Sequence, residues 1–512
     1  MGFNKPAKDE LLALVTLVIC LFLLVGQKFR TYAEPLDRDL ATYAVLGQEM
    51  LHGRVLYRDF WINTPPGIHM AFAAATALVG PGKKAVLCLN LLTSLATLLG
   101  MWAAGLRLGG LGAAIGATVG WVLLSSMPDL QGNQPNIEAF LIPLMVWALV
   151  ILFDGIKPEG KDRSWWAAGA CMAAATLFKQ VAIFPALTLA IPVALGRGDR
   201  KGRVSRLAAF YIPAIAVWVF LGAFLVWTGA WGDFWADTWT FNRSYAGNVP
   251  LNWVQGLRTW PGFLRGLTPL AWTGSLGAAL MLLKDRPKGV LLLAAAVGTY
   301  LAVSGPGNSM PHYYLLWIPI FLLGTVGGAA ISFRISPPWG KIGIGCGALA
   351  FLVGYGGANV RWFRLSPEEW SQRKFGQIFL FDEGLGKRLG MILGPEETFY
   401  QFGNEPSLYI VSGKRPPAAA LLNFAFVGLN SRQADRPPNG PLAEKVLADL
   451  ERNKPEICVV NLWDFQVAMA DYDLVRWIKA HYRPLADSSQ VWPFWLLGRT
   501  GGRLDREGRL LP

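Results

Sequence analysis

The chain has 512 residues, of which 53% are hydrophobic and only 16% are charged, and its formal net charge is +13. Soluble domains carry about 25% charged residues, so a composition this apolar excludes an ordinary soluble enzyme once the apolar residues are found in blocks. The basic residues gather in short connections between those blocks, as orientation in a membrane requires, and therefore do not indicate nucleic-acid binding. The five cysteines stand singly without CxxC spacing, so we expect neither a disulfide framework nor a zinc site.

Long apolar blocks recur from the N-terminus to about residue 360. A helix needs about 20 apolar residues to cross a hydrocarbon layer of ~30 Å. The first block, "LLALVTLVICLFLLVG", lacks a small-residue cleavage site, so we interpret it as a retained anchor. The pattern predicts a polytopic α-helical membrane protein with about eleven spans, at 10–29, 85–106, 110–127, 138–155, 165–180, 181–196, 207–229, 267–284, 289–304, 313–333 and 342–360.

The connections between these blocks predict an orientation. Alternate connections, such as "LRLGG", "KDRPK" and "RISPPWGK", are short and basic, which places them on the cytoplasmic side. The apolar run at 65–80 is too short for a comfortable span and fits a helix at the interface. Residues 30–84 then form one long first outer loop, and the chain after the eleventh span also lies outside.

The composition changes after about residue 361, where the chain becomes charged and is punctuated by Pro and Gly. We expect a transmembrane domain at 1–360 and a small outer α/β domain at 361–512. The expected strands of the second domain are "TFYQFG", "EICVVN" and "SSQVWPFWLLGR", and its expected helices are "GPLAEKVLADLERN" and "DYDLVRWIKAHY".

Polar residues gather at the outer ends of the expected spans. In the first outer loop, "LATYAVLGQEML" (40–51) predicts a helix begun after Asp37 and Asp39, and capping accounts for one of these two carboxylates. Ionisable groups near membrane depth are costly and tend to be paired or functional, although each alone also fits an interfacial anchor. The other candidate residues are Arg58, Asp59, Glu138, Lys179, Gln180, Arg243, His312 and Tyr313.

Together these residues predict an outward-facing polar site in which carboxylates oppose cations. Such a set suits an anionic, phosphate-linked lipid, because the leaving group needs charge neutralisation while a carboxylate removes a proton from an acceptor. A transporter would carry its ionisable residues at mid-span. Their place at the ends of spans therefore favours interfacial chemistry over transport.

The stretch "RDLATYAVLGQEMLHGRVLYRDFWINTPPG" (38–67) resembles the first outer loop of the membrane-embedded GT-C glycosyltransferases, in the branch of protein O-mannosyltransferases and aminoarabinose transferases. The shared pattern is an acidic residue, a Tyr four residues later, a helix ending near a Gly, a Tyr-x-Asp and a Pro-Pro. The resemblance extends over most of the chain through Glu138, Lys179-Gln180, "HYYLLWIPIF" (312–321) and "FGNEPSLYIVSGKRPP" (402–417).

The resemblance implies a GT-C fold and an inverting transfer of a sugar from a polyprenyl-phosphate donor to a glycan, lipid or protein acceptor. It also implies a bacterial inner membrane location, with the active site and the C-terminal domain on the periplasmic side. Its implied residues are Asp39 as general base, Asp59 and Glu138 as further carboxylates, and Arg58, Lys179, Gln180, His312 and Tyr313 at the donor phosphate and lipid. We add Arg243 to the donor-binding set from its place in the outer loop before the eighth span. Asp37 is then the helix cap.

No cofactor or metal is expected. No GxxxxGK[ST] or GxGxxG motif precedes a suitable helix, so no nucleotide-sugar site is predicted. The glycines of "GGLGAAIGAT" (109–118) are small residues that fit packing between membrane helices. Nothing in the chain has convincing metal-ligand spacing.

Two positions depart from the pattern of the resembled family. Many of its members have Asp-Glu where this chain has Asp39-Leu40, and some have an acidic-basic pair before Pro-Pro where this chain has Asn63-Thr64. These differences prevent a transfer of sugar specificity. Two alternatives stay open: a polytopic transporter or flippase of lipid-linked saccharides, and a catalytically inactive scaffold whose outer domain binds a partner.

Overall fold

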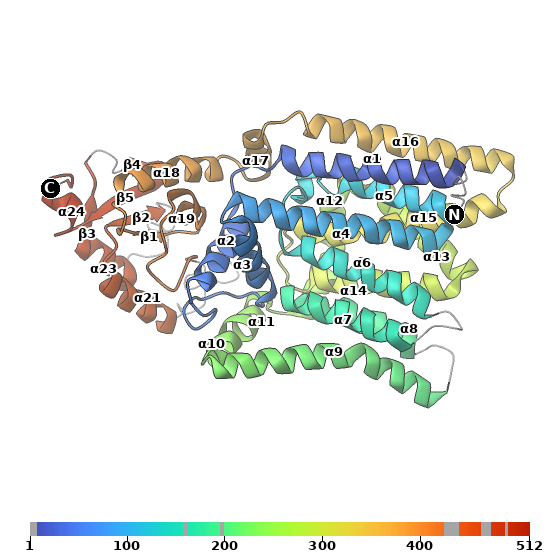
Figure 1. Cartoon of the computed structure of the whole chain (residues 1–512), viewed down its shortest axis with the longest axis horizontal. Helices are drawn as coiled ribbons and strands as arrows, with labels where there is room; N and C mark the ends of the chain where they lie inside the picture. Colours follow the sequence, from blue (N-terminus) through green and yellow to red (C-terminus); the bar gives the residue numbers. More distant parts are fainter. Residues whose placement is uncertain are drawn as a thin grey trace, which may run out of the picture.

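The computed structural model describes residues 8–156, 162–194, 199–423, 440–461, 473–486 and 490–511. Long helices lie side by side in one bundle, and a small sheet with its own helices lies beyond one end of that bundle (Figure 1). The bundle contains α1 (Lys8–Arg30), α4 (Lys83–Gly109), α5 (Leu111–Leu124), α6 (Ile137–Gly155), α7 (Asp162–Phe178), α8 (Ile183–Ala194), α9 (Arg200–Trp227), α13 (Thr268–Lys284), α14 (Arg286–Ser304), α15 (Trp317–Ile335) and α16 (Pro338–Trp362).

Within the described residues, eight helices are long and apolar enough to cross a membrane. In two of them a 3-10 turn is part of the candidate span: η4 (Arg265–Leu267) precedes α13, and η5 (Pro311–Leu316) precedes α15. Three of the expected spans correspond to shorter helices, since α5 has 14 residues, α7 has 17 and α8 has 12. The polytopic helical architecture is therefore confirmed, and the total of eleven spans stays a prediction.

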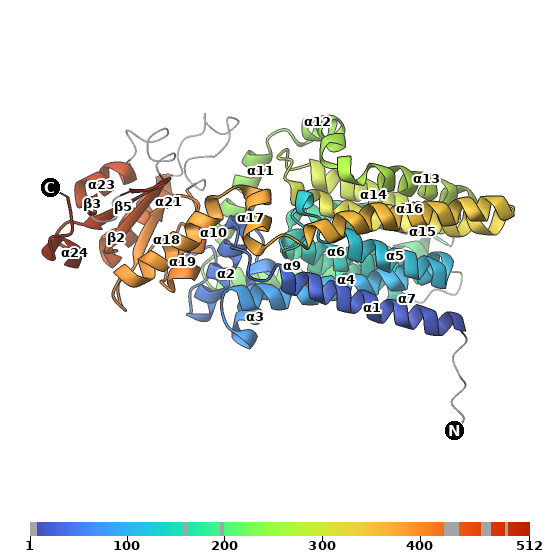
Figure 2. The ribbon, with the colours of Figure 1, turned by 90° about the horizontal axis from the view of Figure 1, so that it is seen from above.

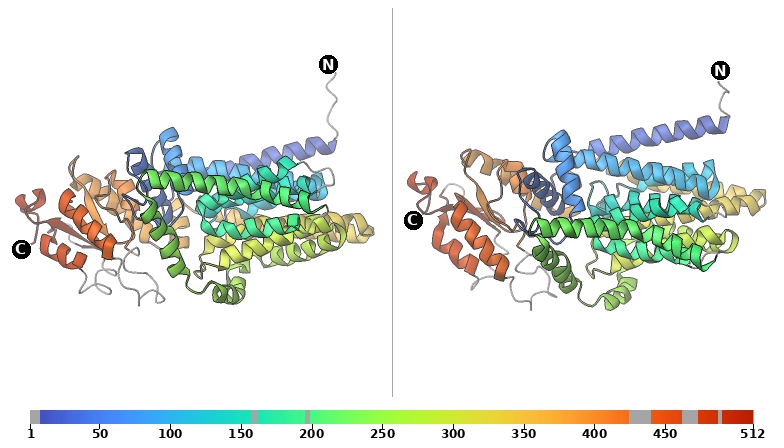
Figure 3. Two further views of the ribbon diagram at one scale, coloured as in Figure 1. Left: turned by 90° about the horizontal axis from the view of Figure 1, so that it is seen from below. Right: turned by 60° about the horizontal axis from the view of Figure 1, so that its bottom comes forward.

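Short elements lie at the end of the bundle that faces the sheet (Figures 1 and 3). The helix expected at 40–51 is α2 (Arg38–Leu51), and the short apolar run after the Pro-Pro forms α3 (Gly67–Val79), which has 13 residues. Gly47 allows these two helices to approach closely, because a Cβ at this position would lie 2.7 Å from the Ala73 nitrogen. The other short elements are η1 (Pro128–Leu130), η2 (Gln180–Ala182), α10 (Trp231–Phe234), the π-helical η3 (Trp235–Thr240), α11 (Phe241–Ala246) and α12 (Val249–Phe263).

The sheet is mixed, with the strand order β1-β2-β5-β3 and with β4 paired to β5. β1 (Phe399–Phe402) runs parallel to β2 (Ile457–Asn461), and β5 (Phe494–Arg499) runs antiparallel to β2. β3 (Tyr482–Pro484) and β4 (Gln490–Val491) are short. The predicted strands at "TFYQFG" and "EICVVN" are confirmed, and the last predicted strand is divided into β4 and β5, with Ser488 and Ser489 outside the described residues.

Helices lie beside the sheet (Figure 2), and successive side chains of β1 and β2, which point to opposite sides, are buried on both faces. One set of strand side chains packs against α18 (Ile378–Ile392) and α19 (Ser407–Ser412). The other set packs against α21 (Gly440–Asn453) and α23 (Asp473–His481). Both predicted helices are thus present, although the first two residues of the second prediction, 471–472, lie outside the described part of the chain.

The small sheet and the first outer loop share one hydrophobic core. Val45 and Leu46 of α2 belong to the same buried cluster as Phe399 of β1 and Leu385 of α18. α17 (Pro367–Phe375), in contrast, places Trp370 in the buried cluster of the bundle. The domain limits 1–360 and 361–512 stay a proposal, and the packing shows that the C-terminal part lies directly on α2.

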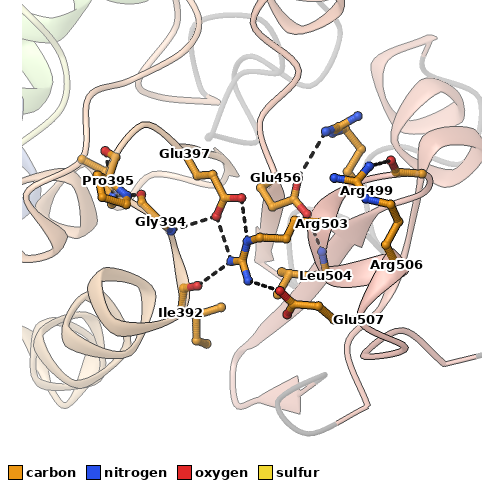
Figure 4. A network of polar contacts seen from close by, with 12 residues as sticks. Ile392, Gly394, Pro395, Glu397, Glu456, Arg499, Arg503, Leu504, Arg506 and Glu507 are labelled. Atoms are coloured by element: carbon orange, nitrogen blue, oxygen red, sulfur yellow. Dashed lines mark hydrogen bonds and ion pairs between the residues drawn. The ribbon is translucent and has the colours of Figure 1, made fainter.

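A network of charged side chains fixes the C-terminal helix α24 (Arg503–Arg506) to the sheet (Figure 4). Arg503 donates from Nε and Nη2 to the two carboxylate oxygens of Glu397, each at 2.8 Å, and Nη2 also donates to the Ile392 carbonyl. Glu456 accepts from the Leu504 nitrogen at 2.7 Å. The two parallel hydrogen bonds between Arg503 and Glu397 are the strongest arrangement available to an Arg and a carboxylate.

Candidate active site

The carboxylate of Asp39 stands in the first turn of α2, where the helix dipole favours negative charge. The helix begins there because Asp37 caps it: Asp37 Oδ1 accepts from the Leu40 nitrogen at 3.1 Å. The prediction that Asp37 is a cap is therefore confirmed. Burial, followed by the charge of Asp39, raises the pKa of Asp37 to about 6. Asp39 itself is half-buried, and its Oδ2 accepts from Nδ2 of Asn136 at 3.3 Å.

Glu138 lies at the start of α6, beside the same Asn136. Asn136 Oδ1 accepts from the Ile137 nitrogen at 2.8 Å, so one amide caps α6 and also contacts Asp39. The Glu138 side chain is only 1% exposed, and its Oε1 accepts from Nζ of Lys179 at 2.6 Å. Nε2 of His312 lies 4.0 Å from the other Glu138 oxygen. A carboxylate that is buried this completely in the protein requires a cationic partner.

Lys179 and His312 reach Glu138 from two further elements. Lys179 stands in an extended conformation between α7 and η2, at the junction that the sequence predicted, and its ammonium lies 3.5 Å from the ring centroid of Tyr313. His312 and Tyr313 are in η5, and His312 Nδ1 forms a hydrogen bond with Oε1 of Gln131 at 2.9 Å. The structure thus brings Glu138, Lys179, His312 and Tyr313 together.

Two tyrosines that the sequence analysis did not assign to the site also face Asp39. Tyr43 is one turn further along α2, and its pKa is raised well above the usual value, first by burial and then by the charge of Asp39. Tyr245, in α11, has its pKa raised to about 12 by burial and by the neighbouring Tyr313 and Asp39. Tyr43 was part of the quoted pattern; Tyr245 had no signal in the sequence.

Gln180 bridges two backbone segments, and its predicted contact with the donor stays a prediction. Its Nε2 donates to the carbonyl oxygens of Thr238, at 3.1 Å, and of Asn63, at 3.4 Å. Asn242 of α11 donates to the same Asn63 carbonyl at 2.5 Å. Gln180 and Asn242 therefore hold the stretch before Pro65-Pro66 in place beside Lys179.

Arg58 and Asp59 form a separate pair. Arg58 donates from Nε and Nη2 to the two oxygens of Asp59, each at 2.9 Å, and Asp59 Oδ2 also accepts from the Val55 nitrogen at 2.7 Å. These bonds, that of Arg58 first, hold the pKa of Asp59 below its usual value. Among the described residues, neither side chain is hydrogen-bonded or ion-paired to the group around Glu138.

Arg243 is exposed on α11, two residues from Tyr245, and its side chain forms no hydrogen bond or ion pair with another described residue. The described part of the chain contains no group of three or more His, Cys, Asp or Glu side chains arranged to hold a metal ion. The absence of a metal requirement stays a prediction.

No protein-family model matches the sequence, and no curated protein matches it. Solved structures of membrane proteins do match. ArnT from Cupriavidus metallidurans bound to undecaprenyl phosphate has a TM-score of 0.59 and 16% identity, over 96% of this chain and 99% of that chain. The oligosaccharyltransferase of Archaeoglobus fulgidus in the apo form has a TM-score of 0.56 and 11% identity, over 96% of this chain and 75% of that chain.

A second structure from Archaeoglobus fulgidus, the oligosaccharyltransferase AglB with an inhibitory peptide and a dolichol-phosphate, matches over 96% of this chain and 74% of that chain, with a TM-score of 0.54 and 11% identity. At identities this low, the structural similarity establishes the fold of the chain and no finer property. The chain has the fold of the GT-C membrane glycosyltransferases, which the resemblance of the first outer loop predicted.

Proposed function

We propose that this protein transfers a sugar from a polyprenyl-phosphate donor to an acceptor hydroxyl at the outer face of a bacterial inner membrane. The observation that carries the proposal is the gathering of Asp39, Glu138, Lys179 and His312 from four separate segments at one end of the bundle. The GT-C fold supports it, since the matching ArnT binds undecaprenyl phosphate and the matching AglB binds a dolichol-phosphate.

Asp39 is the general base of the proposed reaction. The acceptor oxygen forms a bond to the anomeric carbon, the bond from that carbon to the donor phosphate breaks, and the acceptor proton passes to Asp39. A single displacement of this kind inverts the anomeric centre. Half-exposure leaves Asp39 reachable by an acceptor, and its hydrogen bond from Asn136 orients the carboxylate.

The donor phosphate departs with negative charge, which cations at the site would stabilise. Lys179 is the first candidate for this role, with His312 and Tyr313 beside it. Arg243 adds a cation on the exposed side. Arg58 and Asp59 pair with each other and make no bond to the group around Glu138 among the described residues, so we assign them to holding the first outer loop. Glu138 and Gln180 position Lys179 and its surroundings. No metal or cofactor is part of the proposal, and treatment with EDTA should leave transfer unchanged.

The place of the ionisable groups along the helices favours transfer chemistry over transport. Glu138 is the second residue of α6, Lys179 directly follows α7, and His312 precedes α15. A transporter or flippase needs such groups at mid-span.

The test is transfer of radiolabel from a panel of polyprenyl-phosphate sugars by the purified protein in nanodiscs, with membrane glycolipids and peptides as acceptors. Removal of a general base costs about 10²–10⁴-fold in rate, which is the loss expected for Asp39→Asn. Asp129→Asn is the matched control, because Asp129 is an exposed outer carboxylate paired with Arg373 at 3.3 Å. Wild-type rates for a folded Asp39→Asn protein would refute the assignment.

A further inference from the structure

The segment that follows α9 exposes a row of tryptophans. Trp231, Trp235 and Trp239, here called the Trp ladder, are 42%, 51% and 40% exposed. They recur every four residues across α10 and η3, so they share one side of the segment. Figure 3 shows this stretch extending from the end of the bundle that carries the site.

The opposite side of the same segment is buried and belongs to the site. Phe234 packs edge-on against Tyr57 at 5.0 Å, and the side chains of Asp237 and Thr238 are 7% and 1% exposed. The Thr238 carbonyl accepts from Gln180, which neighbours Lys179. The segment therefore has one polar and aromatic side directed into the protein and one indole side that is about half exposed.

The geometry of the indoles decides what they contact. Trp235 lies 6.0 Å from Trp231 and 5.8 Å from Trp239, centroid to centroid, with interplanar angles of 35° and 28°. Trp235 thus has a neighbouring indole on each side, which leaves a sugar ring little room to stack on it.

The exposed side chains next to the Trp ladder indicate that it contacts lipid. α9 directly precedes the ladder and is a candidate span, and only 17% of its most apolar stretch is buried in the protein. Its outward side chains include Phe220 and Trp227, which are 76% and 81% exposed. Indoles with an apolar body and a polar edge are enriched where hydrocarbon meets headgroups. The ladder therefore continues a lipid-facing surface at the outer end of that span.

We infer that the Trp ladder lies in the outer headgroup layer of the membrane, so that the segment 231–246 rests on lipid with one face and holds the loop before Pro65-Pro66 with the other. The occupant of the indole face is the phospholipid headgroup region. This inference concerns contact with the membrane and holds whether or not sugar transfer is the activity.

Site-directed spin labelling tests the inference while leaving the ladder intact. Ala236, exposed beside Trp235, is replaced by Cys in a background whose five native cysteines are changed to Ser, and the labelled protein is placed in phosphatidylglycerol/phosphatidylethanolamine nanodiscs. Accessibility to oxygen and to a water-soluble nickel chelate is compared with two references. Phe220→Cys reports lipid, and Arg452→Cys, on a side chain 73% exposed in the outer domain, reports water.

We expect the ratio of oxygen to nickel accessibility at residue 236 to lie between the ratios at residues 220 and 452. The collision rate of the label with the nickel chelate should be at least threefold lower at residue 236 than at residue 452. Changing Trp231, Trp235 and Trp239 to Ser should move the label toward the water reference. A label at 236 as accessible to nickel as the one at 452 overturns the inference. So does protection of that label by soluble oligosaccharide in the absence of lipid, which would make the ladder a sugar platform. Asp233→Cys, on the exposed side of α10, provides a second label if the variant at 236 fails to fold.

Discussion

Replacement of Lys179 by methionine is expected to destabilise the fold strongly, because it leaves the Glu138 charge buried without its ion-pair partner. The side chains of Glu138 and Lys179 are 1% and 14% exposed, and their charged atoms lie 2.6 Å apart. The second Glu138 oxygen has no hydrogen-bond partner among the described residues. Breaking one partner of a buried pair costs about 3–5 kcal/mol, so Lys179→Met should lower the free energy of unfolding by that amount.

The reciprocal change, Glu138→Gln, should cost less. The Lys179 ammonium keeps its contact with the Tyr313 ring, centred 3.5 Å away, and a cation over an aromatic face is worth about 0.5–2 kcal/mol. The glutamine also retains an oxygen that can accept from Lys179. We expect a loss of about 1–3 kcal/mol. Because the two residues interact directly, the double variant Glu138→Gln/Lys179→Met should be more stable than Lys179→Met alone, by about 1–3 kcal/mol.

The assay is denaturant-induced unfolding in detergent micelles, followed by tryptophan fluorescence for the four proteins of the cycle. Lys288→Met is the matched control, since Lys288 and Asp285 form a more exposed ion pair of similar length, 2.8 Å. Exposed pairs contribute only about 0–1 kcal/mol. Equal stability losses for Lys179→Met and Lys288→Met, or a double variant that simply sums its two single losses, would refute the reasoning that the Glu138 charge is buried and paired.

Three further predictions concern stability. Asp37→Asn keeps the cap but cannot ionise. The pKa of Asp37 is raised from 3.8 to about 6 in the folded protein, so the folded state binds this proton more tightly than the unfolded state. The stability that this difference gives is complete below pH 4 and is lost as the pH rises to about 6. The wild type should therefore lose up to about 3 kcal/mol more than the variant over that interval, measured as melting temperature against pH. Arg503→Ala removes the paired bonds to Glu397 and should weaken the C-terminal sheet by about 1–3 kcal/mol, seen as faster limited proteolysis there with an intact bundle. Arg415→Ala deprives Glu49, which is 2% exposed, of its bonds at 2.7 and 2.8 Å, and should raise hydrogen exchange at the C-terminal end of α2, with Glu49→Gln in the same protein restoring part of the protection.

Features that depend on near neighbours in the chain could be predicted from the sequence. The cap of α2 joins Asp37 to Leu40, three residues on, and helices such as α21 follow from the spacing of their apolar residues. The mixed order of the sheet could not be predicted, because β1 pairs with β2 more than fifty positions further along the chain. That pairing is selected by side-chain packing on both faces of the sheet, which a local pattern does not reveal.

The sequence predicted which residues gather at the candidate site, but it did not predict which side chains pair with one another. The sequence grouped Glu138, Lys179 and His312 at the outer ends of spans, and the structure brings them together. It did not indicate that Arg58 would be neutralised by Asp59, its own neighbour. That pairing depends on a turn in which Tyr57 has a positive φ of 69° and the Val55 nitrogen bonds to Asp59. Such turn geometry is set by packing around Tyr57, which is buried against Phe234.

The position of Asp39 depends on the C-terminal part of the chain as much as on the bundle. Arg38, its immediate neighbour, donates to the Asn404 carbonyl at 2.7 Å. Further along the same loop, the Trp61 nitrogen donates to the Ala419 carbonyl at 2.9 Å, and Glu49 is held by Arg415. The first outer loop is therefore fixed between two bodies, with the Asn136 contact on the bundle side and these bonds on the sheet side. A carboxylate that must meet an acceptor within hydrogen-bond reach tolerates little displacement. Under the proposed function, the small sheet would therefore contribute to transfer by keeping α2 and Asp39 in place.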